Sequence, residues 1–163
     1  MHDDHTTFAE HIRNGTVAMP EQAFSAKKNE TPAAAANQQN TILPPDSDRD
    51  VSAYGEQDHY QQNGVSTALL KQLRNADTKR EIDLHGLTVA QAYETLEQSL
   101  QRAIRHGEVV LTIIHGRGTH SPNGESIIRN KTRYWLQNCP QVLAYVQPHN
   151  TGCVKVLLRS KKR

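Results

Sequence analysis

The chain lacks the features that mark secreted, membrane-spanning and metal-binding proteins. Its two cysteines, Cys139 and Cys153, do not have the spacing of a metal site and are expected to be buried thiols rather than a disulfide. The first residues are acidic and contain no apolar stretch resembling a secretory signal. The longest aliphatic run, residues 109–114, is far shorter than the ~20 residues that span a bilayer. These absences predict a cytoplasmic protein without a membrane partner.

The two halves of the 163-residue chain carry opposite net charge. Residues 1–79 contain 7 Lys and Arg against 11 Asp and Glu, a net of −4, whereas residues 80–163 contain 12 against 6, a net of +6. The second half is therefore the one suited to a polyanionic partner such as nucleic acid. This excess is modest, so the charge alone is equally compatible with an ordinary solvated surface.

Residues 1–62 are predicted to form a mostly disordered extension. From residue 14 onward this segment is rich in Ala, Asn, Gln, Pro and Asp, and it contains too little apolar surface to offset the entropy lost on ordering. Near residues 5–13, Phe8, His11 and Ile12 would share one face of a helical turn. That turn is either a frayed terminus or a short helix that docks on a larger partner.

From residue 63 onward the apolar pattern predicts helices and strands. Within residues 63–79, a helix over 64–76 carries Val65, Leu69 and Leu73 in one stripe and leads into a domain over residues 80–163. The domain's expected elements are a strand at 81–85, a helix at 88–105, a strand at 108–114, a helix at 125–138, and strands at 142–147 and 152–159. This β-α-β-α-β-β order predicts an α/β fold, specifically a two-layer sandwich.

Two short motifs follow the first two strands of this domain. Because a helix connects these strands, they are expected to be parallel, so that their carboxyl ends lie at the same edge of the sheet. Residues 83–86 (Asp-Leu-His-Gly) end one strand, and residues 115–118 (His-Gly-Arg-Gly) follow the other. Ligands of open α/β sheets bind outside the carboxyl ends of strands, and this edge is therefore the predicted site.

Candidate site residues follow from the chemistry of these motifs. Asp83 and His85 lie two residues apart, so both point to one face of the strand, where the carboxylate can orient the imidazole. The helix that begins after Thr88 offers unpaired amides as a seat for phosphate. The candidate substrate-binding residues are Gly86, Gly116, Arg117, Gly118, Arg129 and Lys155. For the loop and the two distant cations, a tight turn and solvated charges are the alternative interpretation.

RNA can be cleaved at such a site without a metal. Its 2′-OH attacks the adjacent phosphorus when a general base, a general acid and a stabilising cation are present. We expect His85 and His115 to be the acid/base pair, in either order, with Asp83 orienting and Arg117 holding the phosphate. DNA cleavage usually needs a metal-activated water, and the six carboxylates of the domain are dispersed. RNA is therefore favoured over DNA, with no cofactor required and a divalent metal expected only for DNA.

Three motifs in this order, residues 83–86, 115–118 and 151–158, together resemble the Smr (small MutS-related) family, in particular its short stand-alone proteobacterial members. The resemblance covers about half of the chain. It implies a fold like the C-terminal domain of bacterial translation initiation factor three. It also implies endonuclease activity, which in some members acts on messenger RNA at stalled or collided ribosomes.

The resemblance carries family motif positions onto Asp83, His85, His115, Gly116 and Gly118. One departure is residues 150–153, Asn-Thr-Gly-Cys, where the family usually has a Gly-Gly-x-Gly turn. The leading hypothesis is an RNA endonuclease, a phosphodiester hydrolase or transesterase, with the extension as a ribosome tether. The alternatives are a DNA-nicking enzyme of repair or recombination and a non-catalytic module that binds RNA or the ribosome.

Overall fold

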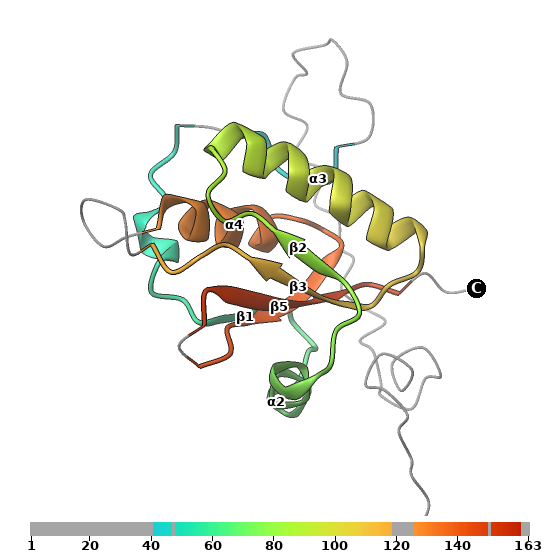
Figure 1. Ribbon diagram of the computed structural model, residues 1–163. Coiled ribbons are helices and arrows are strands. Elements are labelled where there is room, and N and C mark those ends of the chain that lie inside the picture. The colour runs from blue at the N-terminus through green and yellow to red at the C-terminus, as the bar shows by residue number, and fades with distance from the viewer. Residues whose placement is uncertain (1–40, 47, 119–125, 150, 161–163) are drawn as a thin grey trace, which may run out of the picture.

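A five-stranded mixed sheet forms the centre of the chain (Figure 1). The computed structural model describes residues 41–46, 48–118, 126–149 and 151–160. In order across the sheet, the strands are β1 (His59–Gln61), β4 (Val142–Val146), β5 (Cys153–Leu158), β3 (Val110–Ile114) and β2 (Glu81–Asp83). The β2–β3 pair is parallel and the other three pairs are antiparallel.

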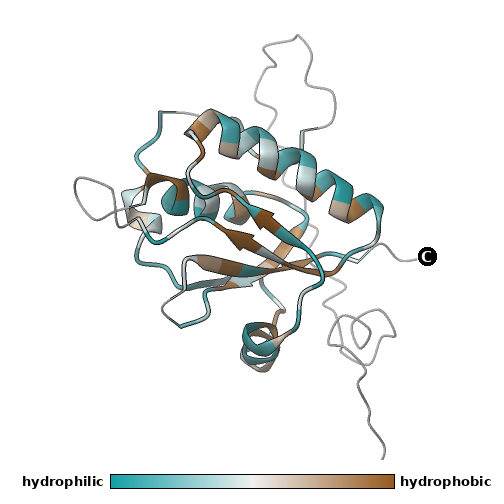
Figure 2. Ribbon diagram, in the orientation of Figure 1, coloured by the Kyte–Doolittle hydropathy of each residue, from teal (hydrophilic) through white to brown (hydrophobic). Residues whose placement is uncertain are grey.

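Helices cover both faces of this sheet. Helices α3 (Val89–Arg105) and α4 (Ile127–Gln137) lie on one face, and α2 (Thr67–Asn75) lies on the other (Figure 1). The apolar residues concentrate in the strands and along the sides of the helices that face them (Figure 2). Among the described residues, no helix combines the length and hydrophobicity that a membrane crossing requires.

The predicted strand–helix–strand unit around the candidate site is confirmed. Ile82 and Leu84 are buried, as the alternation in β2 predicted. Thr88 caps α3 in a capping box with Gln91, in which each side chain accepts a hydrogen bond from the other residue's amide. Helix α4 begins after its N-cap Ser126, close to the predicted start. The α/β sandwich predicted for residues 80–163 is thus the architecture of β2 to β5 with α3 and α4.

The predicted helix before the domain is also confirmed. The stripe of Val65, Leu69 and Leu73 is buried. It packs with residues of β3, β4 and β5 in a second apolar cluster on the face opposite α3 and α4. Burying these aliphatic side chains stabilises the chain by about 1.5–3 kcal/mol each, and α2 is therefore part of the fold.

The prediction of disorder up to residue 62 is wrong for the described residues from 41 onward. β1 adds a fifth strand by pairing His59 with Val146 and Gln61 with Ala144. Ahead of it, a 3-10 turn η1 (Ser52–Tyr54) packs on α4. Leu43 is buried, and its amide donates to Glu97 Oε2 at 2.8 Å. The composition is poor in apolar residues, but hydrogen bonds to α3, α4 and β4 hold this segment in place. Residues 1–40, including the docking helix expected near 5–13, lie outside the described residues.

Candidate active site

An exposed carboxylate–imidazole pair lies at the carboxyl end of β2. Asp83 Oδ1 accepts hydrogen bonds from His85 Nδ1 at 2.6 Å and from the His85 backbone amide at 3.0 Å. The bond from the ring is the main cause that lowers the pKa of Asp83, so its carboxylate stays charged in mild acid. The side chains of His85 and Asp83 are 68% and 52% exposed, respectively. Because Asp83 engages Nδ1, Nε2 is the ring nitrogen left for a substrate.

The loop after β3 lies beside this pair. Asp83 is in register with Ile114, so the chain beyond β3 runs past His85. A Cβ atom built on Gly116 would be 3.6 Å from the His85 Cβ atom, and Gly116 itself has a φ of +81°, a conformation that favours glycine. Arg117 is exposed and follows directly, while Gly86, with a φ of +73°, is exposed after β2. The structure thus brings Asp83, His85 and the backbone of both motifs to one edge, as predicted.

Two glycines hold this loop against the rest of the fold. A Cβ atom on Gly118 would lie 2.7 Å from the Ser126 Cβ atom, so Gly118 packs on the start of α4. The Gly152 carbonyl accepts hydrogen bonds from the amides of His115 and Gly116, both at 2.9 Å. Gly118 therefore packs on α4, and Gly152 supports the loop, a role that its place in the turn at residues 150–153 did not predict. Its position as the glycine immediately before the last strand was the available signal.

The expectation that His115 faces the same phosphate as His85 does not agree with its position. His115 is only 3% exposed, and its Nδ1 contacts the Gly116 carbonyl oxygen at 2.8 Å. Burial, with smaller contributions from Arg133 and Arg129, lowers the pKa of His115 to about 4. By strand alternation His115, the residue after β3, falls on the side of buried Ile113, whereas His85 falls on the side of Asp83, which is in register with Ile114. The His115 ring is therefore buried and neutral at neutral pH, whereas the His85 ring is exposed.

Of the two predicted distant cations, Lys155 has a side-chain contact within the fold. Lys155 donates from Nζ to the Ala76 carbonyl oxygen at 2.6 Å, at the C-terminal end of α2. Arg129 lies in the first turn of α4, where its amide donates to the cap Ser126 Oγ at 3.2 Å and its side chain is half-buried. For Lys155 this contact is a structural role that the sequence pattern did not predict.

The amides at the start of α3 are only partly available to an anion. The capping box uses those of Thr88 and Gln91, at 3.1 and 3.3 Å. Two of the donors predicted to form a phosphate seat are therefore already satisfied within the capping box. Within the described chain, no group of three or more His, Cys, Asp or Glu residues is placed to hold a metal ion.

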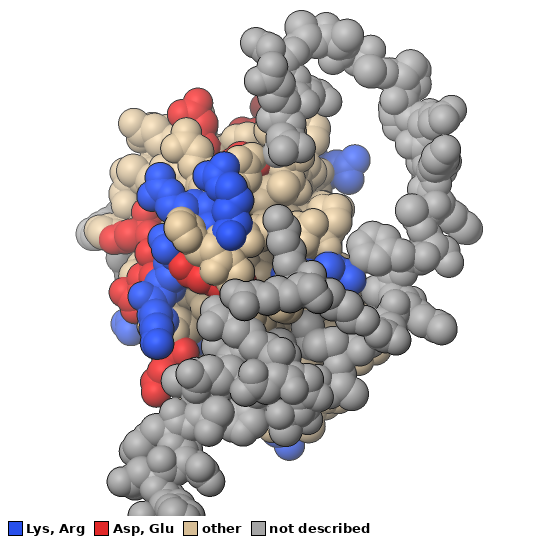
Figure 3. All heavy atoms as spheres, turned by 90° about the vertical axis from the view of Figure 1, so that its right-hand side faces the viewer, with Lys and Arg blue, Asp and Glu red and all other residues tan. Residues whose placement is uncertain are grey.

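Further cations lie at the opposite edge of the sheet, away from the Asp83–His85 pair. There Arg80 Nε pairs with Glu108 at 2.6 Å, and Arg102 and Arg105 are exposed in the last turn of α3. The side of the molecule on which α3 ends shows Lys and Arg side chains interspersed with acidic ones (Figure 3). On this face of the molecule the cations therefore do not form a separate patch of one sign.

Comparison with known proteins agrees with this arrangement. Residues 82–159 match the Smr domain. A ribosome rescue factor SmrB of Pectobacterium carotovorum is 37% identical over 90 residues, which are 54% of this chain and 47% of the relative. An Smr domain-containing protein of Schizosaccharomyces pombe is 38% identical over 80 residues, or 49% of this chain and 38% of the relative. The chain thus spans about half the length of the curated relatives it matches, or less.

A solved structure supports the fold. YdaL, a stand-alone small MutS-related protein from Escherichia coli, superposes with a TM-score of 0.56 at 24% identity, over 63% of this chain and 83% of YdaL. The segment that matches the Smr domain, residues 82–159, begins in β2, ends after β5 and includes both motifs of the candidate site. Residues 82–159 of this chain are therefore an Smr domain.

Proposed function

We propose that this protein is an endonuclease that cleaves RNA through the Asp83–His85 pair. The observation that carries the proposal is the exposed hydrogen bond of 2.6 Å between Asp83 Oδ1 and His85 Nδ1 at the carboxyl edge of the sheet. A docking surface has no need for an imidazole oriented by a carboxylate, whereas proton transfer does. The exposure of both side chains lets a phosphodiester reach Nε2 directly.

In the proposed reaction the 2′-oxygen of the RNA attacks the adjacent phosphorus and the bond to the 5′-oxygen breaks. His85 Nε2 performs one of the two proton transfers, either from the attacking hydroxyl or to the leaving oxygen, and water performs the other. Asp83 keeps the ring in the tautomer that carries its proton on Nδ1. The exposed Arg117 guanidinium, which can bind phosphate oxygens in a fork, stabilises the charge that develops.

His115 takes a different role in this proposal from the one the sequence suggested. Its buried, neutral ring donates to the Gly116 carbonyl oxygen and so helps to hold the Gly116 backbone in its left-handed conformation. It therefore acts through the loop and does not touch the phosphate.

RNA is the favoured substrate because the 2′-hydroxyl supplies the nucleophile. Of the six carboxylates in residues 80–163, Glu97 binds the amides of Ile42 and Leu43 and Glu108 binds Arg80. Glu97 and Glu108 are therefore engaged elsewhere in the fold. The groups at the carboxyl edge of the sheet, Asp83 and His85, are suited to proton transfer. Nicking of DNA, with a divalent metal, is the alternative that the experiment below tests.

A ribosomal setting for this activity is suggested by the relatives. Several enterobacterial proteins that match the domain are named ribosome rescue factors. We propose that the chain likewise acts on RNA at the ribosome, and that residues 1–40 contribute a tether. In this scheme the domain performs the cleavage and the preceding segment raises its local concentration near the substrate.

The test compares the full-length protein with a His85→Ala variant and with a His106→Ala control. His106 is also exposed but caps the distant end of α3. Each protein is incubated with labelled RNA and with supercoiled DNA, with and without EDTA. RNA cleavage that survives EDTA, is lost in His85→Ala and persists in His106→Ala supports the proposal. Metal-dependent DNA nicking supports the alternative, and equal RNA binding without cleavage in all three proteins leaves a binding module.

A further inference from the structure

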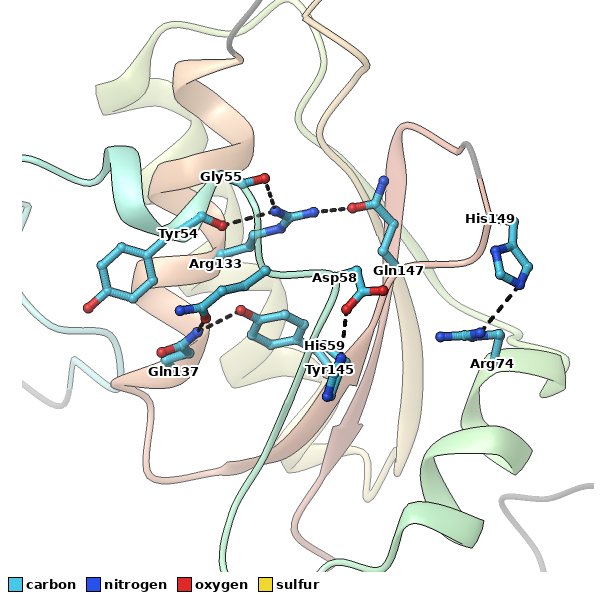
Figure 4. A network of polar contacts seen from close by, with 11 residues as sticks. Tyr54, Gly55, Asp58, His59, Arg74, Arg133, Gln137, Tyr145, Gln147 and His149 are labelled. Carbon is cyan, nitrogen blue, oxygen red and sulfur yellow. Dashed lines mark hydrogen bonds and ion pairs between the residues drawn. The ribbon is translucent and has the colours of Figure 1, made fainter.

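Arg133 is a buried cation that joins two segments distant in the sequence. It lies in α4, is 2% exposed, and donates from Nη1 to the carbonyl oxygens of Tyr54 and Gly55, the former at 2.9 Å. Its Nη2 donates to Gln147 Oε1, in the turn between β4 and β5 (Figure 4). A buried guanidinium needs such acceptors, because losing its hydration without them is strongly unfavourable. Two of the acceptors come from the segment before the Smr match.

The contacts continue from Gln147 to the candidate site. Gln147 Nε2 donates to the Thr151 carbonyl oxygen at 2.9 Å. The next carbonyl, that of Gly152, accepts from the amides of His115 and Gly116, and Gly116 in turn lies against His85. The side-chain amide of Gln147 thus bridges Arg133 on one side and the turn that supports the loop after β3 on the other. Each step is a hydrogen bond or a close contact.

The N-terminal end of this chain of contacts is seated tightly on α4. A Cβ atom on Gly55 would lie 2.8 Å from Asn130 Oδ1, so no larger residue fits there without movement. The rings of Tyr54 and Tyr134 meet edge to face with centroids 5.5 Å apart. The backbone amide of Gln147 also donates to the Asp58 carbonyl oxygen at 2.7 Å, just before β1. These contacts make residues 54–58 a rigid support for the β4–β5 turn.

We propose that residues 54–58, acting through Arg133 and Gln147, position the loop of residues 115–118 for catalysis. Arg133 and Gln147 are positioning residues, because they act through the β4–β5 turn and not on the substrate. The expected effect on the rate of RNA cleavage rests on the proposed nuclease function. The expected effect on the position of the loop does not depend on that function. This proposal implies that the part of the chain needed for full activity begins at or before residue 54, ahead of the Smr match that starts at residue 82.

A Gln147→Glu substitution separates positioning from overall stability. The new carboxylate still accepts from Arg133 and pairs with its charge, so the melting temperature is expected to stay equal or to rise. It no longer donates to the Thr151 carbonyl oxygen and instead repels it. We expect amide hydrogen exchange of His115 and Gly116 to accelerate by about tenfold, the effect of one lost hydrogen bond. The kcat for RNA cleavage is expected to fall by about the same factor while KM changes little.

The matched control is Asp46→Asn. It weakens the 3.0 Å ion pair with Lys131, which also joins the N-terminal segment to α4 but does not involve Gln147. Neither the exchange of the two loop amides nor kcat should change in this variant. If Gln147→Glu does not fold, Gln147→Ala, which removes both side-chain contacts, is measured in the same way.

Faster exchange in Gln147→Glu and unchanged exchange in Asp46→Asn support the inference. If the parent protein cleaves no RNA but the exchange result holds, the positioning stands and the nuclease proposal fails. Unchanged exchange at His115 and Gly116 in the Gln147 variant overturns the inference. So does an equal acceleration in both variants, since that would reflect general loosening of the N-terminal segment.

Discussion

Gly152 lies so close to Gly116 that a Cβ atom on Gly152 would come within 2.9 Å of the Gly116 carbonyl carbon. The same atom would lie 3.1 Å from the Arg117 amide nitrogen, so the two backbones are in direct contact. The turn before the last strand departs from the glycine-rich pattern of the family, yet it retains glycine where the loop after β3 needs the space. The departure therefore leaves this contact intact.

A Gly152→Ala substitution should destabilise the fold by about 1–3 kcal/mol, because the methyl group meets backbone atoms that cannot move aside easily. RNA cleavage should fall further than stability alone explains, since the loop beside His85 shifts. Urea denaturation and cleavage assays measure the two effects. Gly107→Ala is the control: it has a φ of +70° but open space around it. It should cost only about 1 kcal/mol and leave cleavage intact.

Replacing Asp83 with Asn tests whether orientation of His85 matters. The amide keeps the size of the carboxylate but removes the charge that favours a proton on Nδ1. We expect kcat to fall by about 10²-fold, within the range found for positioned acid–base groups, with little change in RNA affinity. Cleavage and RNA binding are measured in parallel. Wild-type kcat would show that the pair has no part in the reaction.

Stability should decrease in mild acid because of His115. Burial lowers its pKa from the ordinary value of 6.5 to about 4, so the unfolded chain binds a proton in this range before the folded protein does. Protons then favour unfolding, and stability is lost as the pH falls from 6.5 toward 4. The contribution of this group is about 3 kcal/mol.

His115→Asn should remove this dependence, because Asn does not titrate but can still donate to the Gly116 carbonyl oxygen. Denaturant midpoints measured across the interval for both proteins provide the comparison. Parallel pH profiles would mean that His115 is protonated as readily in the folded state as in the unfolded chain.

Truncation at residue 40 should separate tethering from cleavage. Removing residues 1–40 leaves every described element in place, so cleavage of free RNA should persist while co-sedimentation with ribosomes weakens. Removing residues 1–62 also deletes β1 and two acceptors of Arg133, and it should lower both the melting temperature and cleavage. Equal ribosome association of the full-length and shorter chains would rule out the tether.

The sequence by itself determined the local structure around the candidate site. The alternation in β2, the capping box at Thr88 and the buried run of β3 are encoded within a few residues each. A helical crossover between two strands then dictates that they are parallel, which brings residues 83–86 and 115–118 to one edge. The placement of the Asp83–His85 pair follows from these short-range rules.

Only the tertiary structure decided what surrounds that edge. β1 has two exposed polar residues and a half-buried tyrosine between them. It becomes a strand because β4 offers it an unpaired edge. His115 is buried because α4 packs over the face of the sheet on which Ile113 lies. Lys155 and Arg133 bind carbonyl oxygens supplied by segments 78 or more positions away. Such outcomes depend on contacts between distant residues, and neither residue spacing nor composition records which distant oxygen a given side chain will meet.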